Sequence, residues 1–339
     1  AVVKTPKPRY WTNSLLTKLD FGQTSLTNWA AGGYNNVTLK SFIDANANYK
    51  KKDLFFNNRL QLDYGFLYSE DKPFIQKSDD RMYYEGKFGY KALQTLNYSA
   101  QFNFKSQFSN SYNYPMPSKP AGAADDWEPG KSDWKQSRKL KSGFFAPAYT
   151  NIALGIDWVP TKWLTVNVAP LTGGFVVVTD ESLRKSYSME LKKKYESLNE
   201  LSSADAAALV GDEKARYEAF VAAKTSGDAY RSARFEFGAQ IKIDGKLQIN
   251  DNFKYTSQLV LFSDYLDKPQ NIRVNWDNRF DWQIAKYFSL TVTTNLIYDD
   301  KVLVKTEKTL KKYPEGRTAI QFKESLAFGF SYTIASRPR

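Results

Sequence analysis

The chain has 339 residues, 16% of them aromatic, with a formal net charge of +12 and a mean hydropathy of −0.55. It contains neither histidine nor cysteine, which excludes Ser-His-Asp and Asp-His hydrolase chemistry and argues against a zinc site. We therefore expect a protein that is not an enzyme and that holds no cofactor or metal. Because lysine and arginine are spread along the chain and are not gathered on one face, we do not expect contact with nucleic acid.

Apolar and polar residues alternate through most of the chain, as they do in strands that have one apolar and one polar face. There is no run of about 18 apolar residues, so the sequence does not predict a transmembrane helix. Many alternating segments run for about ten residues or more, the length that a tilted strand needs to cross a bilayer. In chain order the predicted strands are 12–23, 36–50, 53–68, 80–90, 94–108, 146–159, 163–178, 233–244, 247–263, 271–285, 288–299 and 318–334.

The connections between these segments alternate in length, as in outer-membrane barrels with short periplasmic turns and long extracellular loops. The sequence therefore predicts a single domain, residues 1–339, that folds as a transmembrane antiparallel up-and-down β-barrel of about 12 strands. We expect it in the outer membrane of a Gram-negative bacterium, with both termini in the periplasm. We also expect its basic surface to contact outer-membrane lipid and anionic lipopolysaccharide. Short turns are expected at 51–52, 91–93, 160–162, 245–246 and 286–287, and longer loops at 24–35, 69–79, 109–145, 179–232, 264–270 and 300–317.

Two of the long connections are expected to fold outside the membrane. Residues 109–145 are rich in Ser, Pro, Gly, Asp and Lys and are predicted to form a long extracellular loop. Residues 181–224 are predicted to form an extracellular helical hairpin, because apolar residues recur there at helical spacing. Their apolar faces pack either on each other and the barrel rim or on a partner protein, and both alternatives remain open. The spaced residues are Leu183, Tyr187, Leu191, Leu198 and Leu201 in the first helix, and Leu209, Tyr217 and Phe220 in the second.

Aromatic residues gather at the ends of predicted strands. Trp158 and Trp163 flank the short turn at 160–162, and Trp282 and Tyr287 lie at or near the turn at 286–287. The amphipathic rings of Trp and Tyr favour the boundary between membrane and water. These four residues are therefore predicted to belong to a membrane-interface girdle.

Charged residues of both signs fall on the polar faces of the predicted strands and are candidates for the barrel lumen. In one interpretation they neutralise each other and fill a narrow barrel. In the other they line a pore that selects small solutes. The candidates are Arg59, Asp63, Arg234, Glu236, Lys242, Lys254, Arg273, Asp277, Arg279, Asp281 and Lys323.

The first predicted loop contains the run Asn28-Trp29-Ala30-Ala31-Gly32-Gly33. This run resembles the signature of DUF3078, a family of uncharacterised outer-membrane β-barrel proteins of Bacteroidota. The resemblance implies an outer-membrane barrel and no catalytic residue. Within the motif Asn28, Trp29, Gly32 and Gly33, the glycine pair permits a tight turn with positive φ, and the tryptophan is expected to anchor the loop on the rim. Further resembling blocks lie at 145–149, 154–157 and 169–173.

Two functions fit these observations. The favoured one is a non-enzymatic, structural or accessory subunit of a larger outer-membrane protein complex for assembly or secretion. It follows from the lack of catalytic chemistry, a filled lumen and large folded loops that would meet protein partners. The alternative is a narrow, porin-like channel for the uptake of small polar or anionic solutes.

Overall fold

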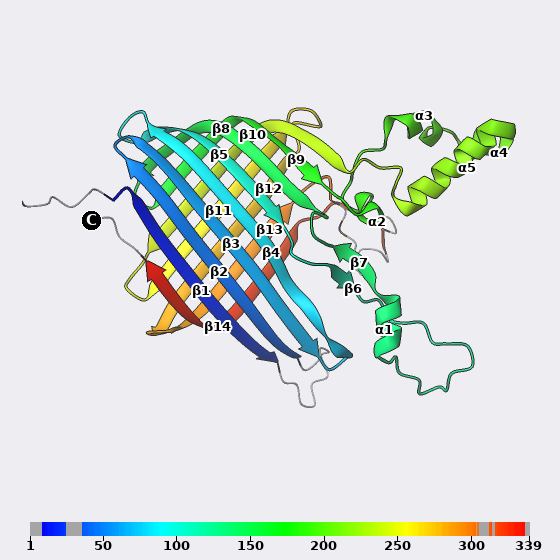
Figure 1. Ribbon diagram of the computed structural model, residues 1–339, viewed down its shortest axis with the longest axis horizontal. Coiled ribbons are helices and arrows are strands. Elements are labelled where there is room, and N and C mark those ends of the chain that lie inside the picture. The colour runs from blue at the N-terminus through cyan, green and yellow to red at the C-terminus, as the bar shows by residue number, and fades with distance from the viewer. Residues whose placement is uncertain (1–8, 25–35, 303, 305–311, 314–315, 336–339) are drawn as a thin grey trace, which may run out of the picture.

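Twelve strands pair in an antiparallel ring that closes between the first strand and the last (Figure 1). In this computed structural model the described residues are 9–24, 36–302, 304, 312–313 and 316–335. The closed ring confirms the predicted fold. The strands follow one another around it in chain order, except that β5 pairs with β8. Their bounds are β1 Trp11–Thr24, β2 Asn36–Lys51, β3 Leu54–Ser69, β4 Lys72–Lys91, β5 Leu96–Ser106, β8 Ala148–Thr161, β9 Leu164–Val177, β10 Ala233–Gln248, β11 Phe253–Asp264, β12 Ile272–Ala285, β13 Phe288–Tyr298 and β14 Gln321–Ala335.

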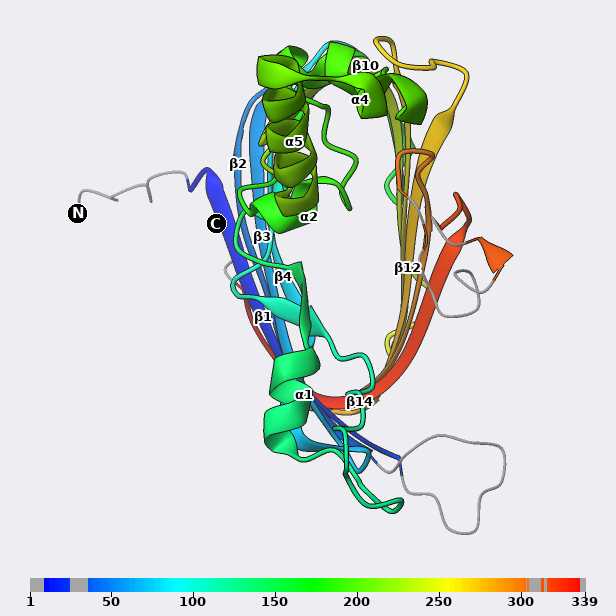
Figure 2. The same cartoon turned by 90° about the vertical axis from the view of Figure 1, so that its right-hand side faces the viewer.

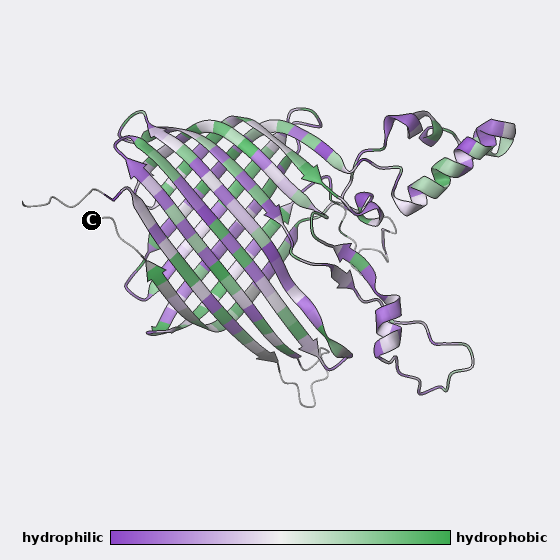
Figure 3. Cartoon of the chain, viewed as in Figure 1, coloured by the Kyte–Doolittle hydropathy of each residue, from purple (hydrophilic) through white to green (hydrophobic). Residues whose placement is uncertain are grey.

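The pleat places opposed residues of neighbouring strands on the same face of the sheet. Between β11 and β12, Leu259 lies opposite Trp276 on the outer face, whereas Lys254 lies opposite Asp281 on the inner face. Figure 3 shows the resulting alternation of polar and apolar residues along the strands. An apolar outer face around a polar interior is the arrangement of a β-barrel that crosses a bilayer. Exposed apolar residues of the outer face include Leu19, Phe66, Leu171, Phe235, Ile272 and Phe328.

The two rims of the barrel differ in the length of their connections. The short-turn rim carries the turns at 52–53, 92–95, 162–163, 249–252 and 286–287. The start of β1 and the end of β14 lie at this same rim, since Trp11 pairs with Tyr49 and Ser14 with Ala335. The long-loop rim carries the folded segments 107–147 and 178–232, which extend to the right in Figure 1. The loop motif Asn28, Trp29, Gly32 and Gly33 lies outside the described residues.

Two of the predicted connections are wrong. Residues 69–79 are not a long loop, because β3 and β4 continue past the expected ends and turn at Glu70–Asp71. Lys77 and Asp80 pair with each other at the extended end of β4. The expected turn at 245–246 lies inside β10, where Gly245 pairs with Leu164 on one side and Ser257 on the other.

The segment 178–232 is helical, but it does not form the predicted pair of helices. The second predicted helix corresponds to α5, whereas the first is divided into short pieces. Leu183 and Met189 pack with Ala146, Val176 and Val178 at the long-loop rim instead of forming one helical stripe. No helix in the described part of the chain is both long and apolar enough to span a membrane. The pieces are α2 Glu181–Arg184, the 3-10 helix Lys193–Tyr195, α3 Glu196–Asn199, α4 Ser203–Ala208 and α5 Gly211–Ser226.

The other large connection, between β5 and β8, has its own small structure. It contains the paired strands β6, Ser111–Asn113, and β7, Lys139–Ser142, with helix α1, Lys131–Ser137, between them. Trp134 of α1 is buried, and Nζ of Lys72 lies 5.3 Å from the centre of its ring. The segment therefore packs beside the extended end of β4.

Viewed from the long-loop side, the ring of strands is an elongated oval (Figure 2). Strands β1 to β4 run along one long side and β12 lies on the other, with β10 near one narrow end and β14 near the opposite end. Flattening brings side chains of non-neighbouring strands within reach of each other at the narrow ends.

Close backbone contact at Gly238 gives a stability prediction. A Cβ atom there would lie 1.9 Å from the carbonyl oxygen of Ser263, whereas at Gly245 on the same strand the nearest atoms lie at 4.0 Å. We expect Gly238→Ala to lower the free energy of unfolding by about 1–3 kcal/mol, and Gly245→Ala to change it by less than about 0.5 kcal/mol. Denaturant unfolding in lipid vesicles, followed by tryptophan fluorescence, measures both. Equal stability of the two variants would contradict the tight packing of β10 on β11.

Candidate functional site

One buried network joins β4 to β10 across the lumen. Nζ of Lys242 lies 2.6 Å from a carboxylate oxygen of Glu85, and the lysine side chain is only 3% exposed. The hydroxyl of Tyr83 and the amide of Gln101 also donate to Glu85, at 2.7 and 3.1 Å. Strands β5, β8 and β9 separate β4 from β10 in the ring. The network therefore fills the narrow end of the oval that these strands enclose.

The same end of the lumen holds a second buried ion pair. Nζ of Lys87 lies 2.8 Å from Asp157, whose other oxygen accepts hydrogen bonds from Asn167 at 2.7 Å and Ser99 at 3.2 Å. All four side chains are buried. A carboxylate with this many donors is well satisfied in a region of low solvent access.

The opposite narrow end is closed in a similar way. Lys18 of β1 donates to Asp281 of β12 at 2.8 Å and to Thr291 of β13 at 3.1 Å. Arg279 makes two hydrogen bonds to the same carboxylate, at 2.7 and 2.9 Å. Its guanidinium also lies 5.4 Å from the ring centre of Phe42 on β2. These contacts join four strands around β14.

Other lumen-facing charges are more open to solvent. Arg81 pairs with Asp63 at 2.7 Å, yet its side chain is 37% exposed. Lys323 reaches Asp79 at 3.3 Å and is 67% exposed. Lys105 is also exposed and forms no hydrogen bond or ion pair with the described residues. We call this solvent-accessible region the central slot.

A short segment of the large insertion is bound to the inner wall at the long-loop mouth. Arg234 of β10 donates to the carbonyl oxygen of Ser188 at 2.6 Å and pairs with Glu236 at 2.9 Å. The hydroxyl of Ser188 donates to the carbonyl oxygen of Lys301, in the connection between β13 and β14. Residues 187–190, which we call the strap, therefore link β10 to a connection farther around the ring.

Burial changes the titration of two groups at this mouth. It raises the pKa of the Tyr187 hydroxyl in the strap. It also raises the pKa of Asp299, although the positive charge of Arg273 opposes this effect. Arg273 is itself held by Glu236 at 2.7 Å. The mouth is thus a partly desolvated region in which charged groups are oriented by one another.

The structure places the predicted lumen residues on the inner face but divides them among different networks. Arg59 pairs with Asp44, and Asp277 accepts hydrogen bonds from Asn275 and Asn295. Lys254 is exposed near the short-turn rim. Sequence reasoning missed several inner-face partners that have the same strand parity. These are Lys18, Lys40, Asp44, Arg81, Glu85, Lys87, Lys105 and Asp157.

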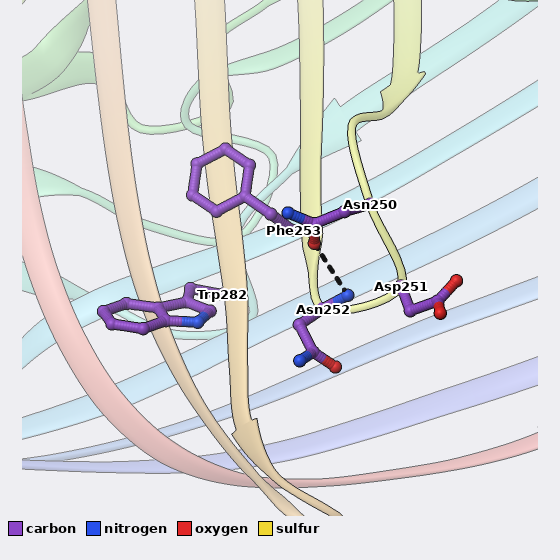
Figure 4. A pocket seen from close by; sticks show the side chains of 5 residues that line it. All are labelled: Asn250, Asp251, Asn252, Phe253 and Trp282. Atoms are coloured by element: carbon purple, nitrogen blue, oxygen red, sulfur yellow. Dashed lines mark hydrogen bonds between the residues drawn. The ribbon is translucent and has the colours of Figure 1, made fainter.

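The predicted girdle residues lie at the short-turn rim. Trp158, Trp163 and Trp282 are exposed there, and the ring centre of Tyr287 lies 5.6 Å from that of Phe330. Figure 4 shows a shallow hollow between Trp282 and the 249–252 turn. Five residues line this hollow, which faces the outside of the barrel, so we assign no catalytic or binding role to it. Within the described ranges, no group of three or more acidic side chains is arranged to hold a metal ion.

The family described as "Protein of unknown function (DUF3078)" matches residues 21–112, which supports the resemblance seen in the first loop. A search of curated proteins finds no match.

Several solved structures are similar to the chain. The COG4313 outer membrane channel from Pseudomonas putida F1 is 8% identical, with 99% of each chain covered and a TM-score of 0.39. The translocator domain of the autotransporter NalP from Neisseria meningitidis is 11% identical, with 98% of this chain and 90% of that chain covered and a TM-score of 0.34. Outer membrane phospholipase A from Escherichia coli is 9% identical, with coverage of 97% and 92% and a TM-score of 0.32.

The buried pair of Lys242 and Glu85 yields a second prediction. Lys242→Met leaves a buried carboxylate without its cation and is expected to lower the free energy of unfolding by about 3–5 kcal/mol. The additional substitution Glu85→Gln removes the unpaired carboxylate and is expected to restore part of the lost free energy of unfolding. A double-mutant cycle from denaturant unfolding measures the coupling.

A surface pair provides the matched control. Lys119 and Asp125 lie 3.1 Å apart in an exposed loop, and breaking that pair is expected to cost less than about 1 kcal/mol. Strictly additive losses at Lys242 and Glu85 would contradict the assignment of this pair to a buried network.

Proposed function

We propose that this protein is a narrow, water-filled channel for small polar solutes in the outer membrane of a Gram-negative bacterium. The observation that carries the proposal is the uneven filling of the lumen. Buried networks occupy the two narrow ends of the oval, whereas Arg81, Lys105 and Lys323 of the central slot stay exposed to solvent. A lumen that served only as a packed core would bury such charges or replace them with apolar residues.

The charges of the central slot favour anionic solutes. Asp63 is within ion-pair distance of both Arg81 and Lys40, and Asp79 is shared by Lys40 and Lys323. Lys105 has no carboxylate within ion-pair distance among the described residues, although Asp63 and Asp277 attract its charge. A slot in which cations share their carboxylates presents a positive potential to a passing ion.

The proposed orientation follows the pattern of outer-membrane barrels. Short turns and termini would face the periplasm and the folded segments 107–147 and 178–232 the outside. The aromatic girdle at the short-turn rim supports an interface at that level. We keep the expectation that the source belongs to the Bacteroidota, as the family resemblance implies.

A second candidate function, the accessory subunit of a larger complex, is supported by a different observation. Helix α5 extends away from the barrel (Figure 1). Val210, at its N-terminal cap, and Val221, within it, are exposed. Exposed apolar side chains on a projecting helix are suited to contact another protein.

Ion selectivity tests the channel. We expect the purified wild type to conduct in planar bilayers with a preference for anions, and Lys105→Glu to shift the reversal potential towards cation selectivity. Lys214→Glu is the matched control, because it makes the same change of charge on the projecting helix α5, outside the lumen. We expect this variant to keep the reversal potential of the wild type. A purified, folded barrel that shows no conductance steps would overturn the proposal.

Co-purification tests the second candidate. If α5 docks a partner, Val210→Ser combined with Val221→Ser is expected to remove a stoichiometric protein that accompanies the wild type in mild detergent. Met116→Ser, at an exposed apolar residue of the other long connection, is the matched control. Identical co-purifying proteins for all three forms would argue against a docking role for α5.

A further inference from the structure

Basic side chains form a collar on the short-turn rim. All are exposed, and none takes part in an ion pair with the described residues. Acidic residues at this rim are few and also exposed, namely Asp53 and Asp251. The basic collar consists of Arg9, Lys50, Lys51, Lys52, Lys91, Lys162 and Lys286.

Charges in the lumen and in the segment 178–232 are largely compensated. In the lumen most lysines and arginines have a carboxylate partner, as Lys242 and Arg273 do. The segment 178–232 contains acidic and basic residues in near-equal numbers.

The collar lies at the level of the aromatic girdle. Nζ of Lys51 is 5.4 Å from the ring centre of Tyr10, and Nζ of Lys286 is 5.0 Å from that of Tyr287. Lys162 stands directly before the exposed Trp163. Such rings lie at headgroup depth, and lysine stems extend along apolar surface to bring their ammonium groups to the same depth.

We propose that the basic collar binds the phosphate groups of anionic phospholipids in the leaflet that meets the short-turn rim. Its members belong to the turns after β2, β4, β8 and β12 and to the start of β1. They are consequently distributed around much of the ring. Lipid headgroups surround a membrane barrel on all sides, whereas one compact protein would reach only a part of this circle. Positive side chains near a membrane surface attract anionic lipid, and salt weakens the attraction.

Thermal unfolding in defined vesicles tests the collar. The wild type is reconstituted in phosphatidylcholine with and without phosphatidylglycerol, and the midpoint is read from the loss of the heat-modifiable band on gels. We expect phosphatidylglycerol to raise the wild-type midpoint by several degrees at low ionic strength and by much less at high ionic strength. The collar variant is expected to lose most of this rise. It carries Gln in place of Lys51, Lys52, Lys91, Lys162 and Lys286.

A second variant removes the same number of charges from the other side of the barrel. It should keep the full response to phosphatidylglycerol, because its lysines lie on the folded long connections. A wild type without a lipid-dependent shift, or a collar variant with an undiminished shift, would overturn the proposal. The control carries Gln in place of Lys139, Lys141, Lys185, Lys193 and Lys214.

Lipid retention keeps the proposal testable if the collar variant does not fold. Native mass spectrometry of the wild type in detergent, after addition of an equal mixture of the two lipids, is expected to show preferential retention of phosphatidylglycerol that added salt removes. Equal retention of both lipids would count against the collar. An unchanged lipid response together with a protein partner lost only from the collar variant would assign the surface to that protein instead.

Discussion

The structure depends on the pairing of β1 with β14, which closes the ring. In hydrocarbon an unpaired backbone N–H or C=O group has no water to bond, so an open sheet edge cannot be exposed to lipid. Because the ring is closed, every barrel strand has a hydrogen-bonded neighbour on both sides. It also fixes which side of each strand faces inward, because a shift of one residue would exchange the two faces. The apolar exterior and the polar lumen are both consequences of this one pairing.

The oval cross-section divides the lumen into regions with different electrostatics. Where the walls approach, as at Lys242 and Glu85 or Lys18 and Asp281, oppositely charged groups meet with little water and hold non-neighbouring strands together. Where the walls stand apart, charges such as Arg81 remain hydrated. The oval shape thus explains both the buried ion pairs at the narrow ends and the hydrated charges elsewhere in the lumen. The ion pairs make the barrel wall rigid, while the hydrated charges keep part of the lumen accessible to solvent.

Local sequence patterns predicted most of the fold but only part of the candidate site. Period-two alternation reports the two faces of a strand, so the strand number and the inward parity of residues such as Arg273 could be predicted from sequence. Turn signals were weaker, since Gly245 adopts extended backbone within β10. The partners of Arg234 in the strap could not be predicted, because that contact depends on how a long insertion folds back on the rim.

The strap also has a consequence for biogenesis. It joins the insertion between β9 and β10 to the connection between β13 and β14, through Ser188 and the carbonyl oxygen of Lys301. One end of this contact is synthesised well before the other, so the insertion cannot reach its docked arrangement until the last hairpin of the barrel is in place. Docking of the strap is therefore a late step of assembly, and protection of residues 187–190 from proteolysis marks a barrel whose final strands have been inserted.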